Sequence, residues 1–217
     1  MECACRSEPR PSLLVDRRRS RLPERRPDFE PKGAAKGGCF VYDRPFVRAF
    51  ASWAMQRYAV AVWSSASPTN LAPLVRHVFG KSAQRLRFVW AQDRCSTEGQ
   101  VPSGRLVEGE GGERRPGMKP RFLKELSRVF EAGLGGLETT LLLDDDEYKA
   151  SRNPAHTALH PQAYTAELAA TDRALSEEGE LRLYLAALAD AASVPAYLAA
   201  HPYSTAATTP AEEETRL

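Results

Sequence analysis

Cysteine is scarce in this chain of 217 residues, and the four cysteines form no recognisable framework. They are Cys3, Cys5, Cys39 and Cys95, and no pair has the C-x-x-C spacing of a structural zinc site. The regular cysteine pattern of small secreted domains is missing as well. The sequence therefore favours reduced, structurally ordinary thiols over a disulfide-stapled or zinc-stabilised fold.

Long apolar runs and an excess of one charge are also missing. No run approaches the roughly 20 apolar residues that cross a bilayer, so we predict no membrane span in this chain. Its 30 basic residues against 28 acidic residues leave a net charge of +2, which is too balanced to indicate a nucleic-acid partner. Acidic residues among the N-terminal arginines argue against an organellar transit peptide.

What the sequence does contain is enough apolar material for one domain with loose ends. It is 42% hydrophobic and 27% charged, a balance that can bury a substantial core. Composition predicts a mobile Arg/Pro/Gly-rich segment over residues 1–38, a folded domain over 39–203 and a disordered tail over 204–217.

The middle of the chain alternates between strand and helix patterns. Asp43 is predicted to cap the first helix, and Gly80 to end the second. The expected strands are "YAVAVWSS", "LRFVWA" and "TTLLLDD"; the expected helices are "DRPFVRAFASWAMQRY", "TNLAPLVRHVFG", "RFLKELSRVFEAG" and "LRLYLAALADAASVPAYLAAH"; a polar loop is expected over 92–117. This order predicts an α/β domain with a parallel sheet covered by helices on both faces.

Chemically active side chains follow two of the predicted strands. Ser64 ends one strand, and Asp144 and Asp145 follow another. Ligands of parallel sheets gather beyond the carboxyl ends of the strands, and neighbouring carboxylates repel one another unless a cation lies among them. With Lys119, which precedes a predicted helix, these are the groups needed to hold a phosphoryl group and a magnesium ion.

Four segments resemble a known family in order and without large gaps. "DRPFVRAFASWAMQRYAVAVWSSA", "KPRFLKEL", "TTLLLDDDEYKASRNPAHTALHP" and "LRLYLAALADAASVPAYL" are similar to the NLI-interacting-factor-like phosphatases, relatives of the RNA polymerase C-terminal-domain small phosphatases in the haloacid dehalogenase superfamily. The likeness runs from about Asp43 to Tyr203 and is closest to a plant subgroup. It implies a doubly wound, haloacid-dehalogenase-like α/β fold and a Mg2+-dependent protein Ser/Thr phosphatase that forms an aspartyl-phosphate.

The same resemblance implies roles for the candidate site residues. Ser64 would hydrogen-bond the phosphoryl oxygens, and Lys119 would stabilise the nucleophile and the phosphoryl charge. Asp145 would be the magnesium ligand, with Asp144 supporting it. Asp146 stands where the family commonly has a small residue, so we interpret it as an extra, solvated acid.

The family's first motif, an apolar strand that ends in the nucleophilic aspartate, is not intact. In one alignment "SLLVDRR" follows the motif, Pro9 stands in the nucleophile's place and the first strand is incomplete. In the other, "SLLVD" is the strand, Asp16 is the nucleophile, and Arg18 stands where a second acid is usual. Three consecutive arginines are a poor continuation for a loop around magnesium, which favours the first alignment and implies weak magnesium binding.

Whether the chain is an enzyme therefore stays open at this point. One hypothesis is an impaired phosphatase, cytoplasmic or nuclear, that acts on a phosphoprotein. The alternative is a non-catalytic module similar to the presequence receptor subunit of the mitochondrial inner-membrane translocase, whose partners would be translocase subunits and presequences during protein import. A third is a pseudoenzyme that binds phosphoprotein through Ser64 and Lys119 without turnover.

Overall fold

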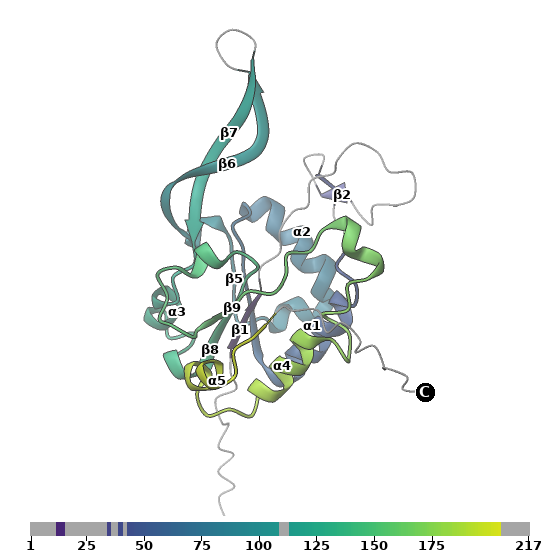
Figure 1. Ribbon diagram of the computed structural model, residues 1–217, viewed down its shortest axis with the longest axis vertical. Coiled ribbons are helices and arrows are strands. Elements are labelled where there is room, and N and C mark those ends of the chain that lie inside the picture. The colour runs from purple at the N-terminus through teal and green to yellow at the C-terminus, as the bar shows by residue number, and fades with distance from the viewer. Residues whose placement is uncertain (1–11, 16–33, 36–38, 41–42, 109–112, 205–217) are drawn as a thin grey trace, which may run out of the picture.

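A computed structural model describes residues 12–15, 34–35, 39–40, 43–108 and 113–204 (Figure 1). The predicted mobile segment, 1–38, and the predicted tail, 204–217, lie almost wholly outside these ranges, so their mobility stays a prediction. Within the described ranges, no helix is long and apolar enough to span a membrane.

A parallel sheet forms the centre of the described structure. Its strands, in spatial order, are β5 (Val89–Trp90), β4 (Ala59–Trp63), β1 (Ser12–Val15), β8 (Thr140–Leu143) and β9 (Ala158–Leu159). All four neighbouring pairs are parallel. The chain moves outward from β1 to β4 and β5, then crosses to β8 and β9 on the other side. The predicted parallel α/β class is confirmed, while a doubly wound sheet as a whole stays a prediction.

The central strand differs from the expectation of an incomplete first strand. Ser12 pairs with Ala59 and Thr140, and Val15 pairs with Val62 and Leu143, so β1 bridges β4 and β8 along its whole length. The physical reason is that β4 and β8 are both buried strands whose backbone groups need partners. "SLLV" supplies them, which agrees with the alignment that makes "SLLVD" the strand. The next residue in the sequence, Asp16, lies outside the described residues.

Helices pack on both faces of this sheet. They are α1 (Val47–Arg57), α2 (Pro68–Phe79), α3 (Ser127–Glu131), α4 (Glu180–Leu188) and α5 (Val194–Ala200). Side chains alternate along a strand: Val60 and Leu143 face a cluster shared with α1, α4 and α5. Ala61 and Leu142 face the opposite cluster, where Val129 of α3 packs. The sheet is therefore dry on both sides, as parallel sheets usually are.

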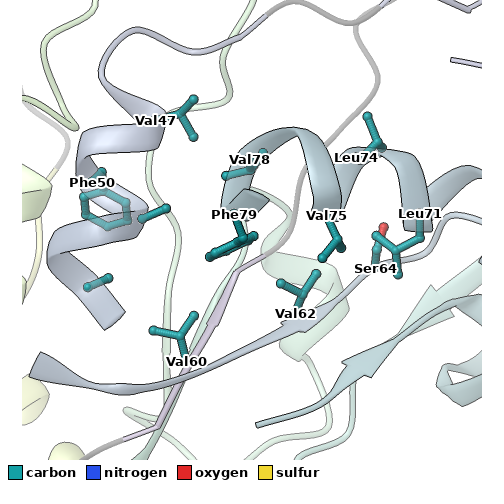
Figure 2. A pocket seen from close by; sticks show the side chains of 12 residues that line it. Val47, Phe50, Val60, Val62, Ser64, Leu71, Leu74, Val75, Val78 and Phe79 are labelled. Carbon is teal, nitrogen blue, oxygen red and sulfur yellow. The ribbon is translucent and has the colours of Figure 1, made fainter. Parts of the chain in front are cut away.

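Helix α2 packs against β4 with a small gap (Figure 2). The cavity there has a volume of about 40 Å³ and is lined by apolar side chains of α1, α2 and β4. Figure 2 shows Phe50, Val62 and Val75 reaching into it from three different elements, with Ser64 at one end. Pockets that hold small organic ligands are roughly 300–1,000 Å³, so this gap is a packing void.

A β-hairpin replaces most of the polar loop predicted over 92–117. Strand β6 (Ser96–Glu108) pairs antiparallel with β7 (Arg114–Leu123) and extends from the domain as a long arm (Figure 1). Because β7 includes Arg121–Leu123, the helix predicted from "RFLKEL" begins only at Ser127. A shorter antiparallel pair joins β2 (Ala34–Ala35) to β3 (Cys39–Phe40).

The long C-terminal helix predicted from "LRLYLAALADAASVPAYLAAH" is two helices. Helix α4 ends at Leu188, and the Ser193 hydroxyl accepts a hydrogen bond from the Ala196 N–H at the start of α5. Pro195 stands in the first turn of α5, where its missing N–H costs nothing. Short 3-10 segments complete the described structure: η1 (Gly80–Arg85), η2 (Gln92–Arg94), η3 (Leu137–Thr139), η4 (Glu147–Ala150) and η5 (Ala166–Ala170).

Two predicted helix boundaries have different outcomes. Gly80 ends α2 with a positive φ of 54°, a conformation that glycine adopts readily, so that prediction is confirmed. The prediction that Asp43 caps α1 is wrong, because Phe46 precedes the helix. The Asp43 carboxylate instead lies 2.8 Å from His77 Nε2 and ties the entry of α1 to α2.

Two tyrosines of the cluster that α1, α4 and α5 share differ in the hydrogen bonding of their hydroxyls. The Tyr58 hydroxyl donates to the Leu185 carbonyl, whereas the Tyr203 hydroxyl is buried with no hydrogen-bond partner among the described residues. Burial raises the pKa of both groups, that of Tyr203 to about 12, so both are neutral donors at neutral pH.

We expect Tyr58→Phe to lower the free energy of unfolding by about 1 kcal/mol, because the buried hydrogen bond to the Leu185 carbonyl is lost and that carbonyl keeps the Ala189 N–H as a donor. Tyr203→Phe is the matched control and should leave stability unchanged or slightly higher, because it removes an unsatisfied polar atom. Urea denaturation followed by circular dichroism measures both. Equal losses in the two variants would contradict this account.

Candidate active site

The candidate site lies at the carboxyl edge of the parallel sheet. Strands β1, β4 and β8 are in register, with Val15 level with Val62 and Leu143. Asp144 directly follows β8, and Ser64 directly follows the last residue of β4. The predicted convergence of these strand ends is therefore present, at the edge where ligands of parallel sheets bind.

Asp144 is the most buried acid at this edge, and two lysines enclose it. Lys124 Nζ donates to its Oδ2 at 2.8 Å, and Lys149 Nζ donates to its Oδ1 at 3.1 Å. The Asp146 backbone N–H also donates to Oδ1, at 2.9 Å. The side chains of Asp144 and Lys124 are fully buried, and that of Lys149 is 3% exposed. Buried charges persist only when they are paired and hydrogen-bonded in this way.

Backbone hydrogen bonds hold Lys124 in position. Its own N–H donates to the Lys149 carbonyl at 2.8 Å, which joins the end of β7 to η4. The Asn153 amide donates to the Lys124 carbonyl at 2.9 Å and accepts from the Leu126 N–H at 2.8 Å. The Asn153 side chain thus fixes the backbone on both sides of the turn that leads to α3. The lysine is directed at Asp144 by this framework.

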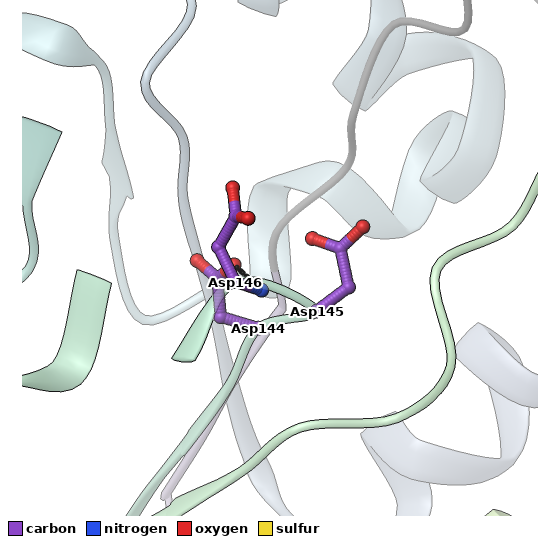
Figure 3. A group of neighbouring side chains, drawn as sticks. All are labelled: Asp144, Asp145 and Asp146. Carbon is purple, nitrogen blue, oxygen red and sulfur yellow. Dashed lines mark hydrogen bonds between the residues drawn. The ribbon is translucent and has the colours of Figure 1, made fainter. Parts of the chain in front are cut away.

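Asp145 and Asp146 are the more accessible acids. Figure 3 shows their side chains projecting to the same side of the strand end, next to Asp144. One carboxylate oxygen from each of the three acids lies within 4.8 Å of the others. Lys149 Nζ lies 3.2 Å from Asp146 Oδ2, so Asp146 is not merely the solvated acid that we expected.

The donor set fits a hard divalent cation. Carboxylate oxygens are the ligands that magnesium prefers, and among the described residues the cluster holds three carboxylates beside two lysines. Both oxygens of Asp144 already accept hydrogen bonds. Asp145 is partly exposed and is therefore more accessible to a metal ion than the buried Asp144.

Ser64 is 3% exposed and is fixed by β5 and by its own turn. Its N–H donates to the Trp90 carbonyl at 2.9 Å, and its Oγ accepts from the Ala66 N–H at 3.1 Å. With one lone pair used in this way, the hydroxyl hydrogen can still be donated to a ligand.

The lysine nearest the acids is Lys124, whereas the sequence pointed to Lys119. Lys119 lies on β7 opposite Val101, and its side chain is exposed. Both lysines occur in "KPRFLKEL", and what distinguishes them in the sequence is the residue that each one follows. Lys124 directly follows the fully buried Leu123, as Asp144 follows Leu143. Lys149, which was not among the candidate residues of the sequence analysis, also belongs to the cluster.

The sequence model of the NLI interacting factor-like phosphatase family matches residues 13–195, a range that begins inside β1. A solved structure of the fission yeast RNA polymerase II CTD phosphatase Fcp1, a variant bound to beryllium fluoride, matches with a TM-score of 0.44 and 15% identity over 82% of this chain and 51% of that one.

A second Fcp1 structure, described as an essential RNA polymerase II CTD phosphatase, matches with a TM-score of 0.38 and 13% identity over 72% of this chain and 40% of that one. The present chain thus spans about half or less of these two neighbours. The comparison with curated proteins gave no match.

Lys124→Met should lower the free energy of unfolding by about 3 kcal/mol, because it leaves the buried Asp144 with one ammonium partner in place of two. Lys119→Met is the matched control on the same strand and should change stability by less than about 0.5 kcal/mol, since its side chain is exposed. Guanidinium denaturation of the two variants beside the unaltered chain tests this. A Lys119→Met loss as large as that of Lys124→Met would show that the buried pairing does not stabilise the domain.

Proposed function

Because the chain belongs to the NLI interacting factor-like phosphatase family, we propose that it is a magnesium-dependent phosphoprotein phosphatase domain that acts through an aspartyl-phosphate on Asp16. The observation that supports this proposal most is the register of β1. Val15 is level with Val62 and Leu143, and Asp16 is the next residue in the sequence. The nucleophile thus follows the central strand, as Asp144 follows β8.

In the first step, a carboxylate oxygen of Asp16 attacks phosphorus and the bond to the substrate's serine or threonine oxygen breaks. Water then attacks the phosphorus of the aspartyl-phosphate, which releases phosphate and restores the carboxylate. Ser64 supports these steps by donating its hydroxyl hydrogen to a phosphoryl oxygen, and Lys124 by placing a positive charge at the same edge of the sheet. Lys124 therefore takes the role that the sequence suggested for Lys119.

Asp145 would hold a magnesium ion, which would supply positive charge to offset that of the phosphoryl oxygens. Asp144 would support Asp145 indirectly, by holding the loop in place. Its two lysines and the Asp146 N–H fix the loop from which Asp145 projects. We place the domain in the cytoplasm or nucleus, with a phosphoprotein as its substrate.

The step that this chain performs poorly is proton transfer. The leaving serine or threonine oxygen must gain a proton, and the family's second acid would supply it from two residues after the nucleophile. Arg18 stands at that position in the alignment with Asp16 as nucleophile. Loss of a general acid costs roughly 10²–10⁴ in rate, so we propose that turnover is slow.

A second candidate function rests on the same arginine. A domain that binds phosphoprotein but does not hydrolyse it would keep Ser64 and Lys124 and would tolerate Arg18. The further alternative, a presequence-binding module of the mitochondrial inner membrane, would be excluded if tagged protein fractionates with the cytosol or nucleus and does not bind presequence peptides.

Purified chain should hydrolyse an aryl phosphate only with magnesium, and Asp16→Asn should abolish that turnover. Asp145→Asn should need at least about tenfold more magnesium for half-maximal rate, as expected when metal coordination is weakened. Asp190→Asn, an exposed acid far along the sequence in the α4–α5 turn, is the control and should behave as the unaltered chain. Absence of turnover in all of these folded proteins would eliminate the phosphatase and leave the phosphoprotein-binding function.

Arg18→Asp should raise turnover, by up to roughly 10²–10⁴, because it restores an acid where the leaving oxygen needs a proton. Arg19→Asp changes the charge equally at the neighbouring position and should have a much smaller effect. Steady-state hydrolysis at saturating magnesium compares the two. Equal rates in both variants would argue that Asp16 and Arg18 do not occupy the family's first motif.

A further inference from the structure

A polar cleft opens beside the candidate active site, between the end of β5, η2 and α3. Its volume is about 490 Å³, which is within the range of roughly 300–1,000 Å³ that is typical of ligand sites. We call it the α3 cleft. The polar, charged and aromatic side chains that line it are Trp90, Arg94, Glu125, Ser127, Arg128 and Glu131.

Two of these residues connect the α3 cleft to the candidate active site. Trp90 is the last residue of β5, and its carbonyl accepts the Ser64 N–H at 2.9 Å. Glu125 directly follows Lys124, whose ammonium group donates to Asp144. The cleft therefore lies at the same carboxyl edge of the sheet as the acids, on the side of β5.

Two arginines line the α3 cleft from separate elements, Arg94 from η2 and Arg128 from α3. Both are exposed, and neither forms an ion pair with a described residue. The Arg94 guanidinium lies 5.7 Å from the centroid of the Trp90 ring. That ring packs in turn on Phe88 and Trp63, with centroids 4.3 and 5.1 Å away. A packed aromatic cluster, and not an acid, thus holds Arg94 at the cleft.

The acids of the α3 cleft leave these two arginines available. Glu125 has a partner outside the cleft, since its Oε1 lies 3.0 Å from Arg152 Nη1. Glu131 stands three residues after Arg128 on α3 and forms no ion pair with a described residue. Among the charged groups of the cleft without an ion-pair partner in the described structure, two are therefore arginines and one is a glutamate. A ligand that adds negative charge can pair with both guanidinium groups.

We propose that the α3 cleft binds an anionic side chain of the phosphoprotein substrate, a carboxylate or a second phosphate, through Arg94 and Arg128. This rests on the proposed function and narrows its substrate class. Guanidinium groups match both anions, because their N–H donors are arranged as a planar fork.

The position of this anionic side chain in the substrate follows from the order of the strands. β5 lies two strands from β1, which is about 10 Å at the usual strand spacing, and an extended peptide covers about 3.4 Å per residue. The anionic side chain should therefore stand about three residues from the residue that is dephosphorylated.

The test measures binding of fluorescent peptides by anisotropy with magnesium present. Their central residue is a phosphonate analogue of phosphoserine, which resists hydrolysis, so binding does not depend on turnover. One peptide has glutamates about two to four residues before this residue, and a second has them after it. A third has further phosphonates at these positions, and a fourth has glutamine. At least one anionic peptide should bind at least about tenfold more tightly than the glutamine peptide, which is the effect of about one hydrogen bond between charged groups.

The double variant Arg94→Gln, Arg128→Gln should lose this preference, whereas the double change to lysine should keep part of it, because the charge remains and the planar fork is lost. The control is Arg76→Gln with Arg85→Gln, which removes two exposed arginines outside the cleft and should retain the preference. Glu131→Gln should increase the preference, because it removes an acid from the same cleft.

Equal binding of all four peptides to the unaltered chain, or an equal loss in both pairs of arginine variants, would overturn the proposal. So would a weaker preference in Glu131→Gln. A preference shared by the glutamate peptides assigns the cleft to carboxylates as well as phosphates, and a preference for the third peptide alone assigns it to a second phosphate. If the unaltered chain hydrolyses no aryl phosphate, the proposed function fails, while the peptide preference still decides the α3 cleft.

Discussion

The pairing of Asp144 with Lys124 and Lys149 is the constraint on which the carboxyl edge of the sheet depends. Three charged side chains are buried together. Removal of Asp144 would take away the carboxylate that both ammonium groups share, and removal of either lysine would leave Asp144 with one ammonium partner in place of two, in a medium that tolerates buried charge poorly. The pairing joins three separate parts of the chain, namely the end of β7, the end of β8 and the η4 turn. The hairpin, the acids and the loop that carries Tyr148 are thereby held as one unit.

Much of this edge could be predicted from the sequence, because strand ends are visible there. "YAVAVWSS" and "TTLLLDD" are apolar runs of strand length that end in polar residues, and they form β4 and β8. A parallel sheet then brings Ser64 and Asp144 to the same edge, whatever the details of packing. The first strand could not be predicted in this way. The arginines that follow "SLLV" suggested that the strand is incomplete, but they lie after it. The strand itself forms because the backbone groups of β4 and β8 need hydrogen-bonding partners, which "SLLV" supplies.

The parts that sequence reasoning missed are those whose stability comes from pairing and not from a core. Strands β6 and β7 contain proline, glycine and charged residues, and their composition is that of a loop. A two-stranded ladder needs no apolar face when it lies outside the sheet, so it leaves no periodic signal. The choice between two lysines was equally hard to make from the sequence. Lys119 and Lys124 stand in the same motif, and it is the burial of Lys124 in the folded chain that distinguishes them. The break between α4 and α5 was visible in Ser193 and Pro195, but the alanine-rich pattern on both sides outweighed them.

The charged residues of the chain are unevenly distributed in the structure, although their numbers nearly balance. A net charge of +2 argued against electrostatic recognition, yet three acids gather at the end of β8, where two lysines contact them. The charge of the whole chain therefore says little about the charge at this edge of the sheet. A phosphoryl group brought to this edge would need a cation among the acids, so the local arrangement of carboxylates and lysines decides what the edge can bind.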